Sequence, residues 1–133
     1  MLYASDTRNG APFFPRIGGR VFQTLEIPST LPTLDELLGR PEYPDGRIVA
    51  HYVSLLREDA VNVLTIHAEI EGMGRRALFR ALLAAGREHG VEFIRLDDYA
   101  RELLAHRDAL PVRDQIFAPV DGRSGVVAMG APV

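Results

Sequence analysis

The chain has 133 residues, 47% of them hydrophobic and 25% charged, which are ordinary proportions for a globular protein. Its formal net charge of -3 provides no global basic field of the kind that binds nucleic acid, and the absence of cysteine excludes disulfide frameworks and thiolate metal sites. The length suggests a single domain with a core of reasonable size.

No segment of the sequence carries the pattern of a membrane span or a secretory signal. No apolar run approaches the roughly 18 residues of a spanning helix. The first residues lack a basic region followed by an apolar stretch. Together with the missing cysteines, which suit a reducing compartment, these features lead us to expect a cytoplasmic protein.

The first quarter of the chain is dominated by turns. Residues 1–4 are predicted to form a short strand. Glycine and proline recur from 6 to 32, which favours a long loop and excludes a helix, although 21–27 could pair as a small hairpin arm. Loops of this length are often functional.

The middle of the chain alternates helical and extended patterns. Thr33 and Glu36 form the pattern of a capping box, with which a short helix that stops at Gly39 would begin. Apolar periodicity predicts further helices at 45–57, 75–88 and 97–104, and strands at 61–66 and 91–94. The order of strand, helix, strand and helix favours a parallel α/β fold. The tail at 111–133 is predicted to be an irregular loop with one or two short strands.

The histidine at the end of the predicted strand 61–66 is the first candidate for chemistry. If the extended conformation continues past His67, the side chains of Glu69 and Glu71 project to the same side as the ring. Ligands and chemistry collect at the C-terminal ends of such strands, and an imidazole can act as a general acid or base. A histidine beside a buried strand is also commonly a satisfied core residue, so both interpretations stay open.

Other polar groups have structural explanations beside functional ones. No two histidines lie three or four residues apart, so the helical pair of many zinc sites is missing. Asp97 and Asp98 imitate an acidic metal pair, but Asp97 is also well placed to cap the following helix. Four arginines give helix 75–88 a basic face, which is either solvated or binds an anionic headgroup or a lipid-linked phosphate.

Several stretches together resemble one family. The segment at 27–36 reads IPSTLPTLDE, and the segment at 65–72 reads TIHAEIEG. Residues 5–15 contain SDTR and APFFP, and residues 121–125 read DGRSG. These motifs resemble the bacterial deformylases that act on undecaprenyl-phosphate-linked formamido-arabinose, which belong to the NodB-like polysaccharide deacetylase group.

The resemblance implies an incomplete α/β fold. It covers only the C-terminal part of the family's distorted (β/α) barrel, so residues 1–133 would form a single partial domain whose N-terminal half is missing. Family members hydrolyse carbohydrate amides with a divalent, zinc-like metal. One Asp and two His of the N-terminal half bind that metal, and this chain lacks those ligands.

The resemblance also implies roles for individual residues. His67 would protonate the departing amine, and Asp6 would orient that histidine. Within this hypothesis the long loop shapes the substrate groove, and we expect Arg8 to contact a phosphate there. From their positions beside His67, Glu69 and Glu71 are predicted to bind substrate. The substrate would be a lipid-linked amino sugar used in lipid A modification, which implies a peripheral contact with the inner membrane and no role for nucleic acid.

A second function class stays open. The chain would be inactive alone if the metal half is required, so it is either the acid-supplying portion of an enzyme or a non-catalytic remnant. A partial barrel exposes strand edges and an apolar face that a partner half would cover. Such a surface would make the chain an interaction module.

Overall fold

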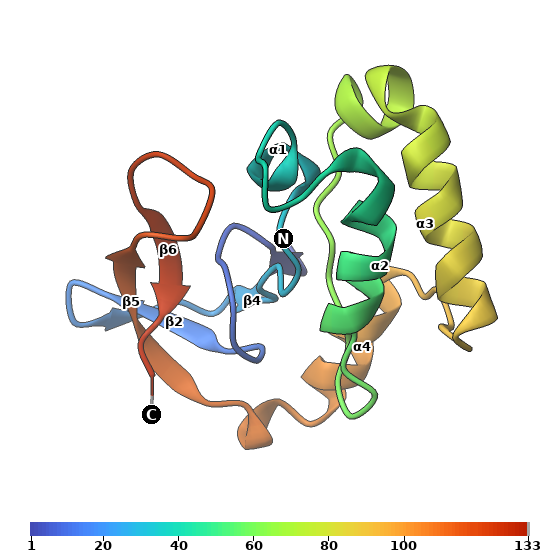
Figure 1. The fold of residues 1–133 in the computed structure, drawn as a ribbon. Helices are drawn as coiled ribbons and strands as arrows, with labels where there is room; N and C mark the ends of the chain where they lie inside the picture. Colours follow the sequence, from blue (N-terminus) through green and yellow to red (C-terminus); the bar gives the residue numbers. More distant parts are fainter. Residues whose placement is uncertain (133) are drawn as a thin grey trace. The chain divides into compact units, whose positions relative to one another are not determined.

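The computed structural model describes residues 1–132 and divides into two compact units. The first unit contains Met1–Thr30 and the chain from Ile94 onward, and the second contains Leu31–Phe93. Strands lie in the first unit and the longer helices α2 and α3 in the second, which is compatible with the predicted α/β class (Figure 1). The strand pairs are both parallel and antiparallel, so the expectation of a parallel architecture is wrong. No helix among residues 1–132 has the length and apolar character needed to cross a bilayer.

The first unit contains two sheets. The smaller sheet pairs β1 (Tyr3–Ala4) in parallel with β4 (Leu25–Glu26). The larger sheet has the order β3-β2-β5-β6, and its strands are β2 (Phe14–Ile17), β3 (Arg20–Val21), β5 (Val112–Ala118) and β6 (Val127–Gly130). Strand β5 is parallel to β2 and antiparallel to β6, so the sheet is mixed (Figure 1).

The first unit closes around buried residues at 13–14 and 25–27. Phe13, Leu25 and Ile27 are almost fully buried. Strand β6 approaches this core so closely that a Cβ at Gly130 would lie 3.1 Å from two ring carbons of Phe13. A larger residue there would force the buried ring to shift by a few tenths of an ångström.

The predicted long loop at 6–32 contains more regular structure than expected. Strands β2 and β3 form a hairpin whose turn, Gly18 and Gly19, has positive φ angles that favour glycine. The hairpin arm predicted at 21–27 is wrong, because Val21 pairs with β2 whereas Leu25 pairs with β1. In the tail, β5 and β6 confirm the expectation of one or two strands.

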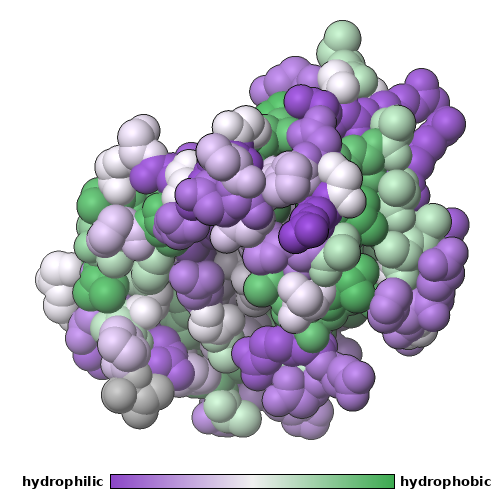
Figure 2. Space-filling view, in the orientation of Figure 1, coloured by the Kyte–Doolittle hydropathy of each residue, from purple (hydrophilic) through white to green (hydrophobic). Residues whose placement is uncertain are grey.

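Helices pack around one cluster in the second unit. They are α1 (Leu34–Leu37), α2 (Asp45–Leu55) and α3 (Arg76–Glu88), with a π-helical turn at Ile70–Gly74. The core consists of five buried residues, Leu31, Leu34, Leu37, Ile48 and Tyr52, and it packs against Leu78 and Leu82 of α3. Figure 2 shows hydrophobic residues gathered where α2 and α3 lie side by side.

The helices predicted at 33–39, 45–57 and 75–88 are confirmed within a few residues. The Glu36 carboxylate accepts the backbone N–H of Thr33 at 3.1 Å, as a capping box requires. Gly90, whose φ is +75°, follows the end of α3 and allows the chain to leave the helix.

The strands predicted at 61–66 and 91–94 are wrong: neither segment forms a strand among the described residues. Apolar and β-branched composition favours extended backbone, but a strand also needs a neighbour that forms a ladder. Instead, Val63 accepts a backbone hydrogen bond from Leu31 at 3.0 Å, outside any ladder. Residues 91–93 fold back on α3, where the Val91 N–H donates to Gly86 and the Phe93 ring packs against Gly86.

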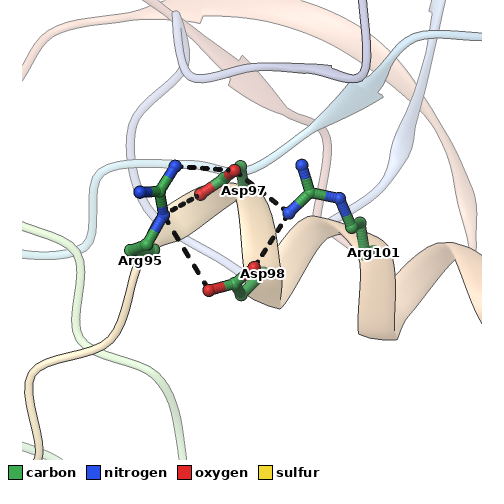
Figure 3. Close-up of polar contacts among 4 residues, drawn as sticks. All are labelled: Arg95, Asp97, Asp98 and Arg101. Atoms are coloured by element: carbon green, nitrogen blue, oxygen red, sulfur yellow. Dashed lines mark hydrogen bonds and ion pairs between the residues drawn. The ribbon is translucent and has the colours of Figure 1, made fainter.

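An ion-pair network surrounds the start of α4 (Leu96–Ala105) (Figure 3). Arg95 precedes the helix and binds Asp97 through two hydrogen bonds of 2.9 and 3.0 Å. Arg101 contacts Asp97 at 3.0 Å and Asp98 at 2.8 Å. The helix predicted at 97–104 is confirmed. Asp97 lies in its first turn, so its predicted position as the N-cap is wrong. There its carboxylate interacts favourably with the positive end of the helix dipole.

Removing the Asp97 carboxylate should change how the first unit responds to acid. Its hydrogen bonds from Arg95 are the main reason that the pKa of Asp97 falls from 3.8 to about 2, and Arg101 lowers it further. At pH values above the unfolded-state pKa of 3.8, the ionised Asp97 carboxylate therefore stabilises the folded state. That stabilisation is lost as the pH falls from about 4 to 2. We expect the urea midpoint of Asp97→Asn to change less between about pH 4 and pH 2 than that of the unchanged protein.

A matched variant checks the cause of that effect. Arg95→Gln removes the principal donor and should reproduce the smaller change expected of Asp97→Asn. An acid transition with unchanged slope in both variants would show that the network contributes nothing to pH-dependent stability.

Candidate functional site

His67 lies where a segment without regular secondary structure ends and a turn begins. The N–H groups of Ile70 and Glu71 both donate to the His67 carbonyl oxygen, at 3.1 and 3.0 Å. The chain then enters the π-helical turn Ile70–Gly74, a local structure that is frequent at functional sites. The expectation that Glu69 and Glu71 continue an extended segment beyond His67 is therefore wrong.

A buried carboxylate holds the backbone of His67 in place. Glu71 is only 3% exposed, and its Oε2 accepts the His67 backbone N–H at 2.8 Å. A hydrogen bond to an ionised group contributes about 1.5–3 kcal/mol. The other oxygen, Oε1, is shielded from solvent and has no hydrogen-bond partner among residues 1–132. Glu71 thus fixes the backbone that carries the candidate acid.

The His67 ring faces a carboxylate that sequence reasoning did not select. Its Nδ1 lies 3.8 Å from Oδ1 of Asp35, which lies in the first turn of α1. The side chains are 36% and 46% exposed, so the ring is not a sealed core residue. Nδ1 itself is shielded from solvent and makes no hydrogen bond with the described residues. The only available signal was the position of Asp35 inside the segment 27–36 that resembles the deformylases.

Glu69 is exposed and immediately precedes the π-helical turn. It therefore belongs to the same unit as His67 but has a different environment from the buried Glu71.

Two of the four arginines predicted to form a basic face on helix 75–88 have partners within this unit. Arg75 pairs with Asp45 at 2.6 Å, and the Arg87 guanidinium lies 5.9 Å from the Phe93 ring centroid.

Asp6 and Arg8 lie in the first unit, in a loop that a second buried carboxylate organises. Oε1 of Glu26 accepts the N–H of Asp6 at 2.6 Å, and it also accepts the N–H and hydroxyl of Thr7 at 2.9 and 3.0 Å. The Arg8 N–H donates to Ala128 at 2.9 Å, which ties the loop to β6. The Asp6 side chain remains exposed, whereas Arg8 is half-buried. Their catalytic and phosphate-binding roles stay predictions.

A divalent metal has no ready site in the described part of the chain. Residues 1–132 contain no cluster of three or more His, Cys, Asp or Glu side chains placed to hold an ion. Asp97 and Asp98, which imitate a metal pair in the sequence, are both engaged by arginines. His89 and His106 directly follow α3 and α4 and belong to no such cluster. The described residues therefore do not fit a complete metal centre.

Comparison with known proteins identifies two similar deformylases. No protein-family model matches the chain. A probable 4-deoxy-4-formamido-L-arabinose-phosphoundecaprenol deformylase (ArnD) of Shewanella sediminis is 36% identical over 124 residues, which cover 92% of this chain and 38% of that protein. A protein of the same name from Wigglesworthia glossinidia brevipalpis is 32% identical over 127 residues, which cover 95% of this chain and 43% of that protein.

The similarity extends over nearly all of this chain but over less than half of each relative. The chain spans about two fifths of the length of the curated relatives that it matches. The resemblance inferred from the sequence motifs is confirmed: the chain fits a C-terminal portion of the formamido-arabinose-phosphoundecaprenol deformylase family.

Proposed function

We propose that this chain is the acid-supplying portion of an enzyme that removes a formyl group from a lipid-linked amino sugar. The observation that carries the proposal is the setting of His67, whose backbone is held by the buried Glu71 while its ring stays 36% exposed. A general acid needs both a fixed position and access to the group that it protonates. The similarity to deformylases supplies the substrate class.

Hydrolysis of a formamide breaks a C–N bond whose nitrogen is a poor leaving group. Water adds to the formyl carbon, and the bond breaks as the nitrogen takes a proton, releasing formate and an amine. In this proposal the imidazolium of His67 gives that proton. The activation of water is assigned to residues outside this chain, because the described residues do not fit a metal centre.

The surroundings of the other three predicted site residues support different roles. Arg8 carries a guanidinium in a loop fixed by Glu26 and β6, which suits recognition of a phosphate. Glu69 is exposed and available to sugar hydroxyls. Glu71 is buried, so we assign its main effect to holding His67. A lipid-linked substrate would bring the protein to the surface of the inner membrane without a spanning helix.

A separate observation favours the alternative, a non-catalytic interaction module. Ile66 and Phe93 are 50% and 53% exposed, and both lie in segments that were predicted to be strands. Large apolar side chains in such segments favour a covering partner. Under either function we expect the chain to associate with the portion that its relatives carry outside the match.

A chimera tests the proposal directly. The matched segment of the Shewanella relative is replaced by this chain, and formate release from undecaprenyl-phosphate-linked formamido-arabinose is measured with and without added zinc. We expect metal-dependent release from the chimera and none from this chain alone. A chimera with native-like circular dichroism and bound zinc, but without formate release, would contradict the enzyme and support the interaction module.

A further inference from the structure

We propose that the outer face of α3 binds the surface of a bilayer that contains anionic phospholipids. This face carries an arginine stripe formed by Arg76, Arg80 and Arg87, which are all exposed. The inference deepens the proposed function and rests on it for bringing the protein to a membrane. The choice of surface rests on the charges and side chains of the second unit alone.

The arginine stripe runs straight along the helix. Steps of four and seven residues place its members within about 40° of one another around the axis and spread them over about 16 Å. Leu78 and Leu82 lie on the opposite side of the helix, where they pack against the buried cluster. The stripe therefore faces away from the core of the unit, and α2 lies on the core side of α3 (Figure 1).

No acidic side chain of α3 faces the arginine stripe. The residues between Glu71 and Glu88 include four arginines but no Asp or Glu, although the chain as a whole has a net charge of -3. Arg76 and Arg80 form no hydrogen bond or ion pair with any other residue of 1–132. By contrast, the two arginines at the start of α4 both bind aspartates (Figure 3). The positive charge on α3 is therefore available to an anionic partner.

The stability of the helix does not explain the arginine stripe. Arg76 is the first residue of α3, where the positive end of the helix dipole disfavours a cation. Arg76 and Arg80 are also like charges four residues apart, a spacing that destabilises a helix. Local rules of this kind are broken mainly at functional sites. A negatively charged surface would offset both unfavourable interactions.

Apolar side chains within and beside the stripe favour a bilayer as the anionic partner. Leu83 lies on the same side of the helix, between Arg80 and Arg87. Met73, in the π-helical turn before α3, is 76% exposed. Beyond the other end, Phe93 is 53% exposed and its ring centroid lies 5.9 Å from the Arg87 guanidinium. Elements that lie on a membrane combine arginines at the level of the phosphates with apolar side chains that enter the headgroup region, whereas binding to nucleic acid gains nothing from an exposed methionine.

Binding of vesicles by this chain tests the inference. Co-sedimentation at low salt is measured with vesicles that contain phosphatidylglycerol and with pure phosphatidylcholine vesicles. We expect binding only to the former, and an affinity about 30-fold lower in Arg76→Gln/Arg80→Gln, because each arginine near a charged bilayer changes the affinity several-fold. Met73→Ser should lower the affinity about fivefold at unchanged net charge, because an apolar side chain is lost from the headgroup region.

The matched control is Arg47→Gln/Arg57→Gln, which removes the same charge from exposed arginines of the same unit. We expect its affinity to stay within about threefold of the unchanged protein, since these positions lie outside the stripe. Equal losses in the two double variants, or full binding by a folded Arg76→Gln/Arg80→Gln, would overturn the inference. Duplex DNA bound more tightly than the vesicles would overturn it in favour of a nucleic-acid surface. Circular dichroism establishes that each variant is folded.

Formate release separates this inference from the proposed function. An active chimera whose vesicle binding does not depend on the arginine stripe would sustain the enzyme and remove the membrane surface. Stripe-dependent vesicle binding by a chimera without formate release would sustain the membrane surface and remove the enzyme.

Discussion

Replacing His67 by glutamine in the chimera should slow formate release by about 10²–10⁴-fold, the contribution of a positioned general acid. Glutamine retains hydrogen-bonding atoms and similar bulk but cannot deliver a proton to the departing nitrogen. The Glu71 hydrogen bond to the backbone N–H at position 67 does not depend on the ring, so the fold should survive. The effect should fall on kcat more than on KM, measured by steady-state formate release.

A second histidine provides the control for that experiment. His89 follows α3, is exposed, and contacts the Ala85 carbonyl oxygen through Nδ1 at 2.8 Å. His89→Gln should leave kcat within about twofold because it removes only an exposed contact at a helix end. Full activity in His67→Gln would remove this residue from the reaction.

Truncating Tyr52 to alanine should destabilise the second unit by about 3–5 kcal/mol, as expected for a buried aromatic residue. Tyr52 is 1% exposed and belongs to the cluster formed by α1 and α2. Whole domains are stable by only about 5–15 kcal/mol, so this loss is a large fraction of the total. Urea unfolding followed by NMR signals from α2 and α3 measures it.

The phenylalanine variant separates packing from hydrogen bonding. The Tyr52 hydroxyl donates to the Pro32 carbonyl oxygen at 2.8 Å, directly before the segment that leads into α1. Tyr52→Phe keeps the ring and loses this bond, for which we expect a cost of about 1 kcal/mol. Equal losses in both variants would mean that the hydroxyl, not the ring, dominates the contribution of this residue.

The helices were predictable because their signals are local. Leu78 and Leu82 recur at helical spacing and do face the core, and Gly90 marks the end of α3. The strands were less predictable because pairing is not local. Residues 61–66 have the composition of a strand but no ladder in the described chain, whereas β2 and β5 pair across almost a hundred residues of sequence.

The candidate site was predicted in part, and partly by an argument that the structure does not support. His67 was predicted to end a strand, yet it follows a segment without regular secondary structure and precedes a π-helical turn. Glu69 directly precedes that turn and is exposed, whereas Glu71 lies within the turn and is buried against the backbone of His67. Asp35 precedes His67 by 32 positions, and no periodicity in the sequence relates the two residues.

The π-helical turn also constrains how this part of the chain can vary in length. Its N–H groups at Gly74 and Arg75 reach back five residues, to Glu69 and Ile70, so the turn accommodates one more residue than an α-helical turn. The extra residue is absorbed within the turn, so deleting Gly72 would restore α-helical spacing and leave Leu78 and Leu82 facing the core that they now cover. A second deletion would have no extra residue to remove, so it would rotate α3 by about 100° and turn these leucines away from the core. The loop that carries the reactive ring should therefore tolerate the loss of one residue but not of two.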